Sequence, residues 1–351
     1  MLTIGPLPPP IGGMAAVVAN LEKELGARLD HRLLNNAKTT ADDRTLWSGV
    51  LAQLRLLARL VALLVGWRPT VVHIHTCSNF TFWRNGVDVL LSRLLLRPVV
   101  LHIHGGRFDE FLGALGAVRA LCARRILRAA ARVVVLGDEW QRRLAPWCGA
   151  ERIVVISNGV PVPAQRASGS NGERLRVLCL AAYTPAKGQE ELLRAASELP
   201  ELELYLVGNE LKSGEQRRLE QLAHELGMAD RVWITGPRTG AEKDTLFDHA
   251  DLFALPSHVE GLPMSMLEAM AWGLPVVVTR VGAIPEVVEP GIQGTLVKPG
   301  DVSALRDALR AWSSDPQGRR DAGERGRRLV VENYSVEAAG REIEALYRTV
   351  S

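Results

Sequence analysis

The feature that most constrains the fold is an alternation along the chain, in which short apolar runs are separated by segments of helical periodicity. In the first half these runs are LTI (2–4) and residues 70–75, 98–104, 132–137 and 152–157. In the second half they are RLRVLCLAAY, ELELYLVG, DRVWITG, DLFALP and PVVVT. Apolar runs that alternate with helices are typical of parallel strands covered on both faces. We therefore predict an α/β protein with parallel sheets.

A polar segment divides the two series of strands. Residues 157–173, SNGVPVPAQRASGSNGE, are rich in Ser, Gly, Asn and Pro, which is typical of a linker between domains. The chain has 351 residues, enough for two domains of ordinary size, and 47% of them are hydrophobic, enough for a large core. The predicted domains are 1–160 and 161–331, and residues 332–351 are predicted to form a final helix.

The remaining composition indicates where such a protein works. Its four cysteines include no CxxC pair, which favours a reducing compartment over a disulfide framework or a zinc–cysteine site. Strand-like LTIG follows Met1 directly, so we expect no signal peptide. The most apolar stretch, 54–67, contains Arg55 and Arg59, and we expect it to be too short and too charged to span a membrane. These features predict a cytoplasmic protein.

Charge is unevenly divided between the halves. Residues 1–160 carry 20 Lys+Arg and 11 Asp+Glu (+9), and the remainder carries 22 and 28 (−6), which gives the total of +3. Five arginines crowd the segment 118–132, namely Arg119, Arg124, Arg125, Arg128 and Arg132. A basic amphipathic helix can lie on anionic lipid, although a solvated helix face gives the same pattern. Without interleaved aromatic residues or a known reading motif, we expect no nucleic-acid binding.

Two glutamates mark a candidate site in the second half. Glu260 and Glu268 lie in PSHVEGLPMSMLEAMAWGLPVVVT, residues 256–279. The run before them predicts a buried strand that ends at Pro256, and Pro263 suits the start of a helix. Glu260 is then on a loop at the carboxyl end of a strand, where open α/β sheets bind ligands, and Glu268 is about one turn into the helix. The free N–H groups at the start of this helix suit a diphosphate.

This stretch resembles the paired-glutamate motif of the family-4 retaining glycosyltransferases, and the similarity continues through VGAIPEVVEPGIQGTLVKPGD, residues 281–301. The NGV of residues 158–160 resembles the hinge of that family. The resemblance implies the GT-B fold, with two Rossmann-like domains facing across a cleft and a last helix that returns to the N-terminal domain. It also implies a metal-independent transfer of a hexose from a nucleotide diphosphate sugar to a glycan or lipid-linked acceptor. Surface polysaccharide synthesis at the inner face of the cytoplasmic membrane is the implied setting.

The resemblance also assigns roles to residues. Glu260 would contact the donor sugar, Glu268 would hold the ribose hydroxyls, and Lys187 would bind the diphosphate. The residues assigned to catalysis are His104, Lys187 and Glu260. The residues assigned to the donor are Gly12, Gly13, Lys187, Arg238, Glu260, Gly261, Leu262, Pro263, Met264, Ser265 and Glu268.

One position departs from the family pattern. The family usually carries an arginine five residues before the lysine, but this chain has Ala182 there, with Tyr183 next. Lys187 alone would then neutralise the charge that grows on a leaving diphosphate, unless Lys212 or Arg238 replaces the missing cation. Two other functions therefore stay open. One is a non-catalytic sugar-nucleotide-binding subunit, and the other is a sugar-nucleotide epimerase, which would need acid–base carboxylates from both domains.

The first half contributes a glycine pair and histidines. Gly12 and Gly13 stand between the first strand and the first helix, where they would permit close backbone approach, and they resemble the family's glycine loop. His104 resembles the family's histidine beside the donor sugar, where it can hydrogen-bond a hydroxyl without acting as a base.

Two HxH pairs, at His73 with His75 and at His102 with His104, raise a zinc hypothesis. No carboxylate or cysteine completes the ligand set at a clear spacing, so we expect His73 and His75 to satisfy buried polar groups. The pair Asp42–Asp43 is predicted to lie in a polar loop before a helix, and no DxD pair falls on a cleft loop. We therefore predict no metal and no cofactor besides the donor substrate.

Overall fold

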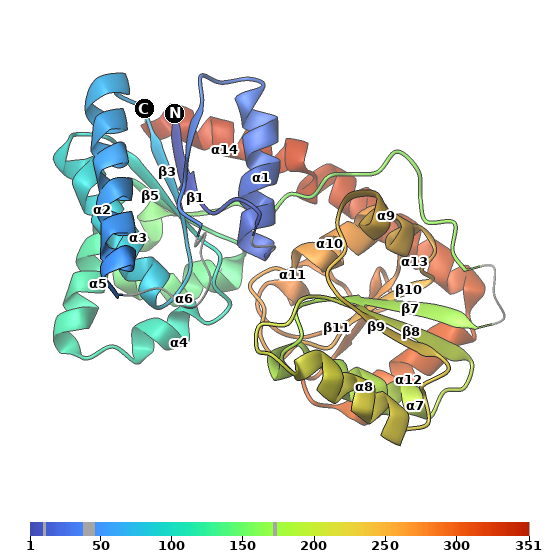
Figure 1. Cartoon of the computed structure of the whole chain (residues 1–351). Helices are drawn as coiled ribbons and strands as arrows, with labels where there is room; N and C mark the ends of the chain where they lie inside the picture. Colours follow the sequence, from blue (N-terminus) through green and yellow to red (C-terminus); the bar gives the residue numbers. More distant parts are fainter. Residues whose placement is uncertain (10–11, 38–45, 171–173, 351) are drawn as a thin grey trace. The chain divides into compact units, whose positions relative to one another are not determined.

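A computed structural model describes residues 1–9, 12–37, 46–170 and 174–350 (Figure 1). The chain forms two compact units. The N-terminal unit contains Met1–Gly159 together with Val336–Ser351, and the C-terminal unit contains Val160–Ser335. The sequence prediction placed the first boundary at residues 160/161 and the return at residue 332. Asp42–Asp43 lie outside the described residues.

The sheet of the N-terminal unit has the strand order β2-β1-β3-β4-β5-β6, and the paired strands are parallel. The strands are β1 (Leu2–Gly5), β2 (Arg32–Asn35), β3 (Val72–Thr76), β4 (Val99–Ile103), β5 (Arg132–Val135) and β6 (Ile153–Val155). Every residue of β1, β3 and β4 is buried, which fits their apolar sequences. The direction of winding reverses between β1 and β3, and this is the switch point of the unit.

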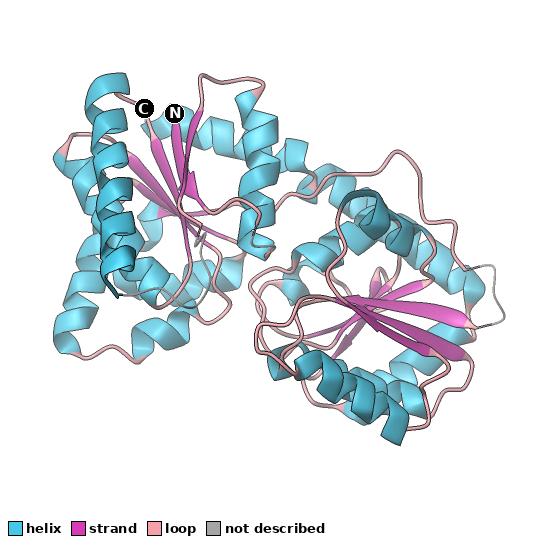
Figure 2. Ribbon diagram, viewed as in Figure 1, coloured by secondary structure: helices cyan, strands magenta, loops and turns pink. Residues whose placement is uncertain are grey.

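Helices cover both faces of this sheet (Figures 1 and 2). They are α1 (Gly13–Gly26), α2 (Leu46–Ala62) with its continuation η1 (Leu63–Trp67), α3 (Phe80–Leu94), α4 (Phe108–Gly113), α5 (Ala117–Ala129), α6 (Asp138–Cys148), the short turn η2 (Ala150–Arg152) and α14 (Val336–Val350). Helices α1 and α14 pack together on one side, and α2, α3 and α5 form a layer on the other. Right-handed crossovers produce this division, because the chain first winds one way from β1 and then the other way.

The C-terminal unit has the strand order β12-β11-β10-β7-β8-β9, again with parallel pairs. Its strands are β7 (Leu175–Leu180), β8 (Leu202–Val207), β9 (Val232–Thr235), β10 (Leu252–Leu255), β11 (Val276–Thr279) and β12 (Gly294–Val297). Its helices are η3 (Pro185–Lys187), α7 (Gln189–Ser197), α8 (Glu215–Glu225), α9 (Gly240–Asp248), α10 (Met264–Ala271), α11 (Ile284–Val287), α12 (Val302–Ser313), α13 (Pro316–Leu329) and η4 (Val330–Tyr334). Winding reverses between β7 and β10, the central pair of this sheet.

The prediction of parallel α/β sheets is confirmed, but the sequence analysis missed the edge strands β2 and β12. In β2 only Leu34 is buried, so the strand lacks a continuous apolar run. Strand β12 begins at Gly294, where a Cβ would lie 1.9 Å from the carbonyl oxygen of Val276. Glycine is therefore required for the two backbones to approach, although it hides the strand in the sequence.

The apolar stretch of the first half also differs from its prediction. Helix α2 continues without a break into η1, so residues Trp47–Trp67 form one helical segment of 21 residues, and the most apolar 18-residue window of this segment has a mean hydropathy of 1.7. By length and composition this helix could cross a membrane. The expectation drawn from residues 54–67 was wrong about length, because the helix begins before that stretch. Only 11% of its most apolar window is buried.

Candidate active site

The candidate site of the C-terminal unit lies at the carboxyl ends of β7 and β10. These strands pair directly, with Val177 opposite Leu252. The chain leaves β7 toward Lys187 and leaves β10 toward Glu260, so the switch point brings the two residues together. Ligands of open α/β sheets bind outside the strand ends at this point.

Lys187 and Glu260 form an ion pair. The Lys187 Nζ lies 2.6 Å from the Glu260 Oε1, and the side chains are 26% and 10% exposed. The Ser257 hydroxyl donates to the same oxygen at 2.8 Å, and the Thr279 hydroxyl donates to the Ser257 carbonyl at 2.5 Å. The carboxylate is therefore held from two sides, while the lysine reaches solvent and keeps further N–H donors.

The loops that carry this pair touch through their backbones. Gly188 follows Lys187 with φ +72°, and a Cβ there would lie 2.1 Å from the Pro256 carbonyl oxygen. The His258 amide donates to the Ala186 carbonyl at 2.8 Å. The His258 Nε2 lies 2.7 Å from Glu191 Oε1 of α7, a contact that the sequence analysis did not anticipate. These contacts fix the separation between the two strand ends.

A second loop supports Glu260 from behind. Gly282 has φ +55°, and a Cβ there would lie 2.3 Å from the Glu260 carbonyl oxygen. The Ala283 amide donates to the Gly261 carbonyl at 2.8 Å. This explains in structural terms why the similarity to the family extends through residues 281–301, since that segment holds the glutamate loop in place.

Helix α10 presents the second glutamate. Pro263 is its N-cap and Met264 its first residue, close to the predicted start at Pro263. Glu268 Oε1 lies 2.8 Å from the Nζ of Lys243, which belongs to α9. Sequence reasoning missed Lys243, because nothing in the sequence of residues 235–243 distinguishes it from a solvated lysine. The fold thus brings two acid–lysine pairs to the same end of the sheet.

The other residues predicted to bind the donor differ in their exposure to solvent. Gly261, Leu262, Pro263 and Met264 are buried in the loop and first turn of α10, and Ser265 is half-buried. Arg238 is exposed and pairs with Glu242 at 3.6 Å, and Lys212 is exposed.

Tyr183 does not replace the cation that Ala182 lacks. The Tyr183 hydroxyl donates to the Leu206 carbonyl at 2.8 Å, and burial raises the pKa of this phenol, so the side chain stays neutral. Lys243 is the second cation that the described fold brings to the glutamates. It pairs with Glu268 and does not occupy the position beside Lys187.

The predicted residues of the N-terminal unit lie at the corresponding end of its own sheet. Gly12 precedes α1 and Gly13 begins it. A Cβ at either glycine would meet no described atom within 4 Å, so packing alone does not require glycine there. His104 follows β4, and its amide donates to the Thr76 carbonyl at 2.9 Å.

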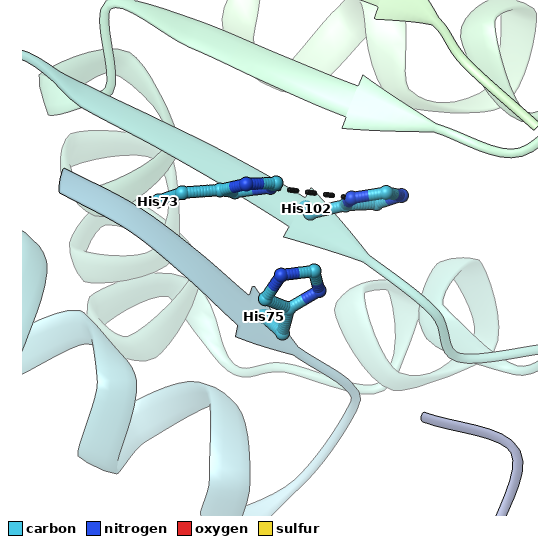
Figure 3. A group of neighbouring side chains, drawn as sticks. All are labelled: His73, His75 and His102. Atoms are coloured by element: carbon cyan, nitrogen blue, oxygen red, sulfur yellow. Dashed lines mark hydrogen bonds between the residues drawn. The ribbon is translucent and has the colours of Figure 1, made fainter. Parts of the chain in front are cut away.

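His73 and His75 of β3, His102 of β4 and His104, which follows β4, form a cluster of neighbouring rings (Figure 3 draws three of them). The His73 Nδ1 lies 2.6 Å from the Tyr347 hydroxyl of α14, and the His73 Nε2 lies 3.3 Å from the His102 Nδ1. The His75 Nδ1 lies 2.8 Å from the His104 Nε2. The last helix is therefore tied to the sheet through His73, as expected for a histidine that satisfies a buried polar group.

Burial makes these imidazoles neutral. It lowers the pKa of His73 and His104 to about 3, and it lowers the pKa of His75 and His102 well below the usual value. His73, His75 and His102 offer nitrogens within 4.8 Å of one another, the grouping behind the zinc hypothesis. Figure 3 shows, however, that His73 and His102 direct ring nitrogens at each other, which is the geometry of a hydrogen bond.

Both units of the chain match models of known protein families. The model of the "Glycosyl transferase 4-like domain" matches residues 12–159, and that of "Glycosyl transferases group 1" matches residues 163–329. Together these matches and the two parallel sheets define a GT-B glycosyltransferase. The chain belongs to glycosyltransferase family 4.

Individual relatives agree with this assignment. A D-inositol 3-phosphate glycosyltransferase of Mycobacterium tuberculosis is 33% identical over 223 residues, which are 60% of this chain and 45% of the relative. The chain thus spans about half the length of the curated relatives it matches.

Solved structures show the same fold over nearly the whole chain. Sucrose-phosphate synthase from Thermosynechococcus elongatus is 20% identical with a TM-score of 0.82, and the match covers 99% of this chain and 98% of that one. Anabaena HepE in complex with UDP is 21% identical with a TM-score of 0.80, and the match covers 99% of both chains.

Proposed function

We propose that this protein transfers a hexose from a nucleoside-diphosphate sugar to a glycan or lipid-linked acceptor, with retention at the anomeric carbon and without a metal ion. The observation that carries the proposal is the pair of acid–lysine contacts at the carboxyl ends of β7 and β10. The structures of HepE with UDP and with UDP-glucose support a nucleotide-sugar donor. We therefore propose uridine nucleotides as the first donors to test.

Lys187 meets the negative charge of the leaving diphosphate in this proposal. An ammonium has three N–H donors, so Lys187 can keep its contact with Glu260 and still donate to a phosphate oxygen. The backbone N–H groups at the start of α10 add donors and a positive dipole end. Charge that grows on the leaving group in the transition state is stabilised by groups that are already in place.

The two glutamates orient the donor. Glu260, which the Ser257 hydroxyl holds, accepts hydrogen bonds from the sugar, and Glu268 accepts them from the ribose hydroxyls. Lys243 is a positioning residue, because it holds one oxygen of Glu268 at 2.8 Å. Arg238, on the exposed loop before α9, is proposed to contact the base.

The N-terminal unit contributes neutral groups. Because burial keeps His104 uncharged, it recognises a sugar hydroxyl by hydrogen bonding and not by charge. Gly12 and Gly13 leave the backbone at the start of α1 open to a phosphate or an acceptor hydroxyl. The departing diphosphate is itself a modest base, so the protein mainly holds donor and acceptor in line.

The test begins with donor binding. Purified protein is screened against nucleoside diphosphates and nucleotide sugars by thermal shift, where a ligand at a hundred times its Kd stabilises by about 2.7 kcal/mol. Turnover is then measured with glycan, lipid-linked and inositol-phosphate acceptors, and NMR of the product gives the anomeric configuration.

Each alternative has its own outcome in this test. An epimerised sugar nucleotide without transfer would identify an epimerase. Donor binding without turnover on any acceptor would favour a non-catalytic subunit, the function that Ala182 keeps open. No stabilisation by any nucleotide would contradict the donor site.

A further inference from the structure

The outer surface of α2 is unusual because apolar side chains point to solvent. Trp47 is 79% exposed, and Leu51, Leu54 and Val65 are also exposed. Leu60 and Leu64 on the inner surface are buried in the unit. Apolar side chains that lie together on an exposed surface are typical of sites that contact a protein or a membrane.

This apolar surface continues onto the neighbouring helices. Helices α2, α3 and α5 form one layer on the sheet (Figure 1). The large exposed apolar residues of α3 and α5 are Phe80, Val87, Leu90, Leu94, Val118 and Leu121. We call the outer surface of these helices the α2–α3–α5 face. A cavity of about 220 Å³ lies between α2 and α3, lined in part by Leu56, Leu57 and Phe80.

The charged residues of these three helices are mostly positive. The segments 46–67, 80–94 and 117–129 contain eight arginines and one acidic residue, Asp88. Asp88 lines the cavity, and burial raises the pKa of its carboxyl to about 6. Arg55, Arg59, Arg119, Arg125 and Arg128 are exposed. An apolar surface bordered by arginines complements the headgroup and acyl boundary of an anionic bilayer.

We propose that the α2–α3–α5 face inserts shallowly into anionic lipid, with α2 lying along the membrane surface and Trp47 at the level of the headgroups. The identification of a membrane-bound acceptor rests on the proposed function. The membrane contact itself is inferred only from the exposed residues of the α2–α3–α5 face.

Two other occupants fit the face less well. A membrane-spanning α2 would have to leave the unit, exposing the buried Leu60 and Leu64 contacts and the sheet beneath them. A second copy of the chain would bring the arginines of one face against those of the other, and like charges in an interface are unfavourable.

The structure also decides which arginines contribute. Arg124 donates to the Pro146 carbonyl at 3.2 Å and lies over the ring of Trp147 at 4.8 Å. It therefore braces α5 against α6, whereas Arg119, Arg125 and Arg128 face solvent.

The experiment is co-flotation of the full chain with vesicles of phosphatidylcholine alone or mixed with phosphatidylglycerol, at low and high salt. The wild type is expected to float with the anionic vesicles. The triple variant Trp47→Ser/Leu51→Ser/Leu54→Ser should lose at least about tenfold in partitioning, because three apolar side chains no longer leave water. The matched control, Leu211→Ser/Val331→Ser, removes exposed apolar residues of the C-terminal unit and should float like the wild type.

Two further measurements separate insertion from charge attraction. The variant Arg119→Glu/Arg125→Glu/Arg128→Glu should reduce flotation at low salt but change little at high salt, where screening already removes that contribution. Brominated lipids should quench the tryptophan fluorescence of the wild type and quench that of Trp47→Phe less.

Several outcomes would overturn the inference. The first is that the wild type does not float, and the second is that the serine variant floats as well as the wild type. The third is that the wild type is a dimer without lipid and the serine variant is a monomer. Nucleotide binding measured on every variant reports folding and keeps the two proposals apart. If the wild type binds the donor but does not float with anionic vesicles, the membrane proposal is contradicted and the proposed reaction is not. If the wild type floats but binds no donor, the proposed reaction is contradicted and the membrane proposal is not.

Discussion

The two units have similar sheets but place their polar chemistry differently. In the C-terminal unit the candidate residues lie beyond the ends of the strands, with Glu260 on a loop and Lys187, Lys243 and Glu268 in helical turns, and they form acid–lysine pairs that are partly exposed. In the N-terminal unit His73, His75 and His102 lie within β3 and β4 and are fully buried. Burial within the strands lowers the pKa of these histidines, because it disfavours the charged imidazolium.

The two units also differ in the exposed apolar residues of their surfaces. Most of the large exposed apolar residues belong to the N-terminal unit, chiefly to α2 and α3, while the C-terminal unit carries Leu211, Trp233 and Val331. The half with the net charge of −6 holds the lysine–glutamate pairs, and the half with +9 holds the apolar face. The net charge of each half therefore does not reveal the lysine–glutamate pairs, which depend on local contacts.

The largest expected effect tests the charged site of the C-terminal unit. Lys187→Ala should lower kcat by about 10²- to 10³-fold with a smaller change in KM, because the ammonium meets charge that is greatest in the transition state. Steady-state kinetics with the identified donor measures this. Lys23→Ala, which removes an exposed lysine in the last turn of α1, should leave turnover nearly unchanged.

A rescue experiment sharpens this prediction. If Ala182 marks a missing cation, Ala182→Arg in the Lys187→Ala background should recover part of the lost turnover. Near-normal turnover of Lys187→Ala by itself would show that another cation carries the role.

The second prediction concerns the neutral histidines of the N-terminal unit. A histidine whose folded pKa is lowered stabilises the fold above its unfolded pKa of 6.5, and this stability is lost as the pH falls toward about 3. At pH 5 each such histidine should cost about 2 kcal/mol relative to pH 7.

Hydrogen exchange, corrected for the intrinsic effect of pH, can measure the two units in one sample. Peptides of β3, β4 and α14 should lose protection at pH 5 before those of β7 and β10 do. Equal losses in both units would contradict the assignment of acid sensitivity to the histidine cluster.

The same contrast explains what the sequence could predict. The buried central strands have apolar runs with glycine and proline at their ends, so they and the loop of Glu260 were found at nearly their true positions. The Lys243–Glu268 and His258–Glu191 contacts join residues 25 and 67 positions apart, and no local pattern encodes such a pairing. The exposure of α2 was hidden for a related reason, since periodicity does not show which side of an apolar helix the core covers.

A third, smaller effect tests the orientation of the donor. Glu268→Ala should weaken binding of the nucleoside diphosphate by about 1.5–3 kcal/mol, the value of a hydrogen bond to a charged group. Isothermal titration calorimetry gives the Kd directly. The control Asp244→Ala removes an exposed acid of α9 and should bind as the wild type does. An unchanged Kd for Glu268→Ala would remove this residue from the site.

The smallest expected effect is that of chelation, and it tests both units together. In the C-terminal unit Lys187 and the start of α10 supply the positive charge for the diphosphate, so EDTA should leave turnover unchanged. In the N-terminal unit, hydrogen bonds engage the His73 nitrogens and one nitrogen each of His75 and His102, so purified protein should contain less than equimolar zinc by mass spectrometry. Loss of activity on chelation with rescue by Mg²⁺ or Mn²⁺ would place a metal at the diphosphate. If the wild type contains equimolar zinc and the variant His73→Ala does not, the metal is bound in the histidine cluster. The contrast between charged pairs in one unit and neutral histidines in the other would then be wrong.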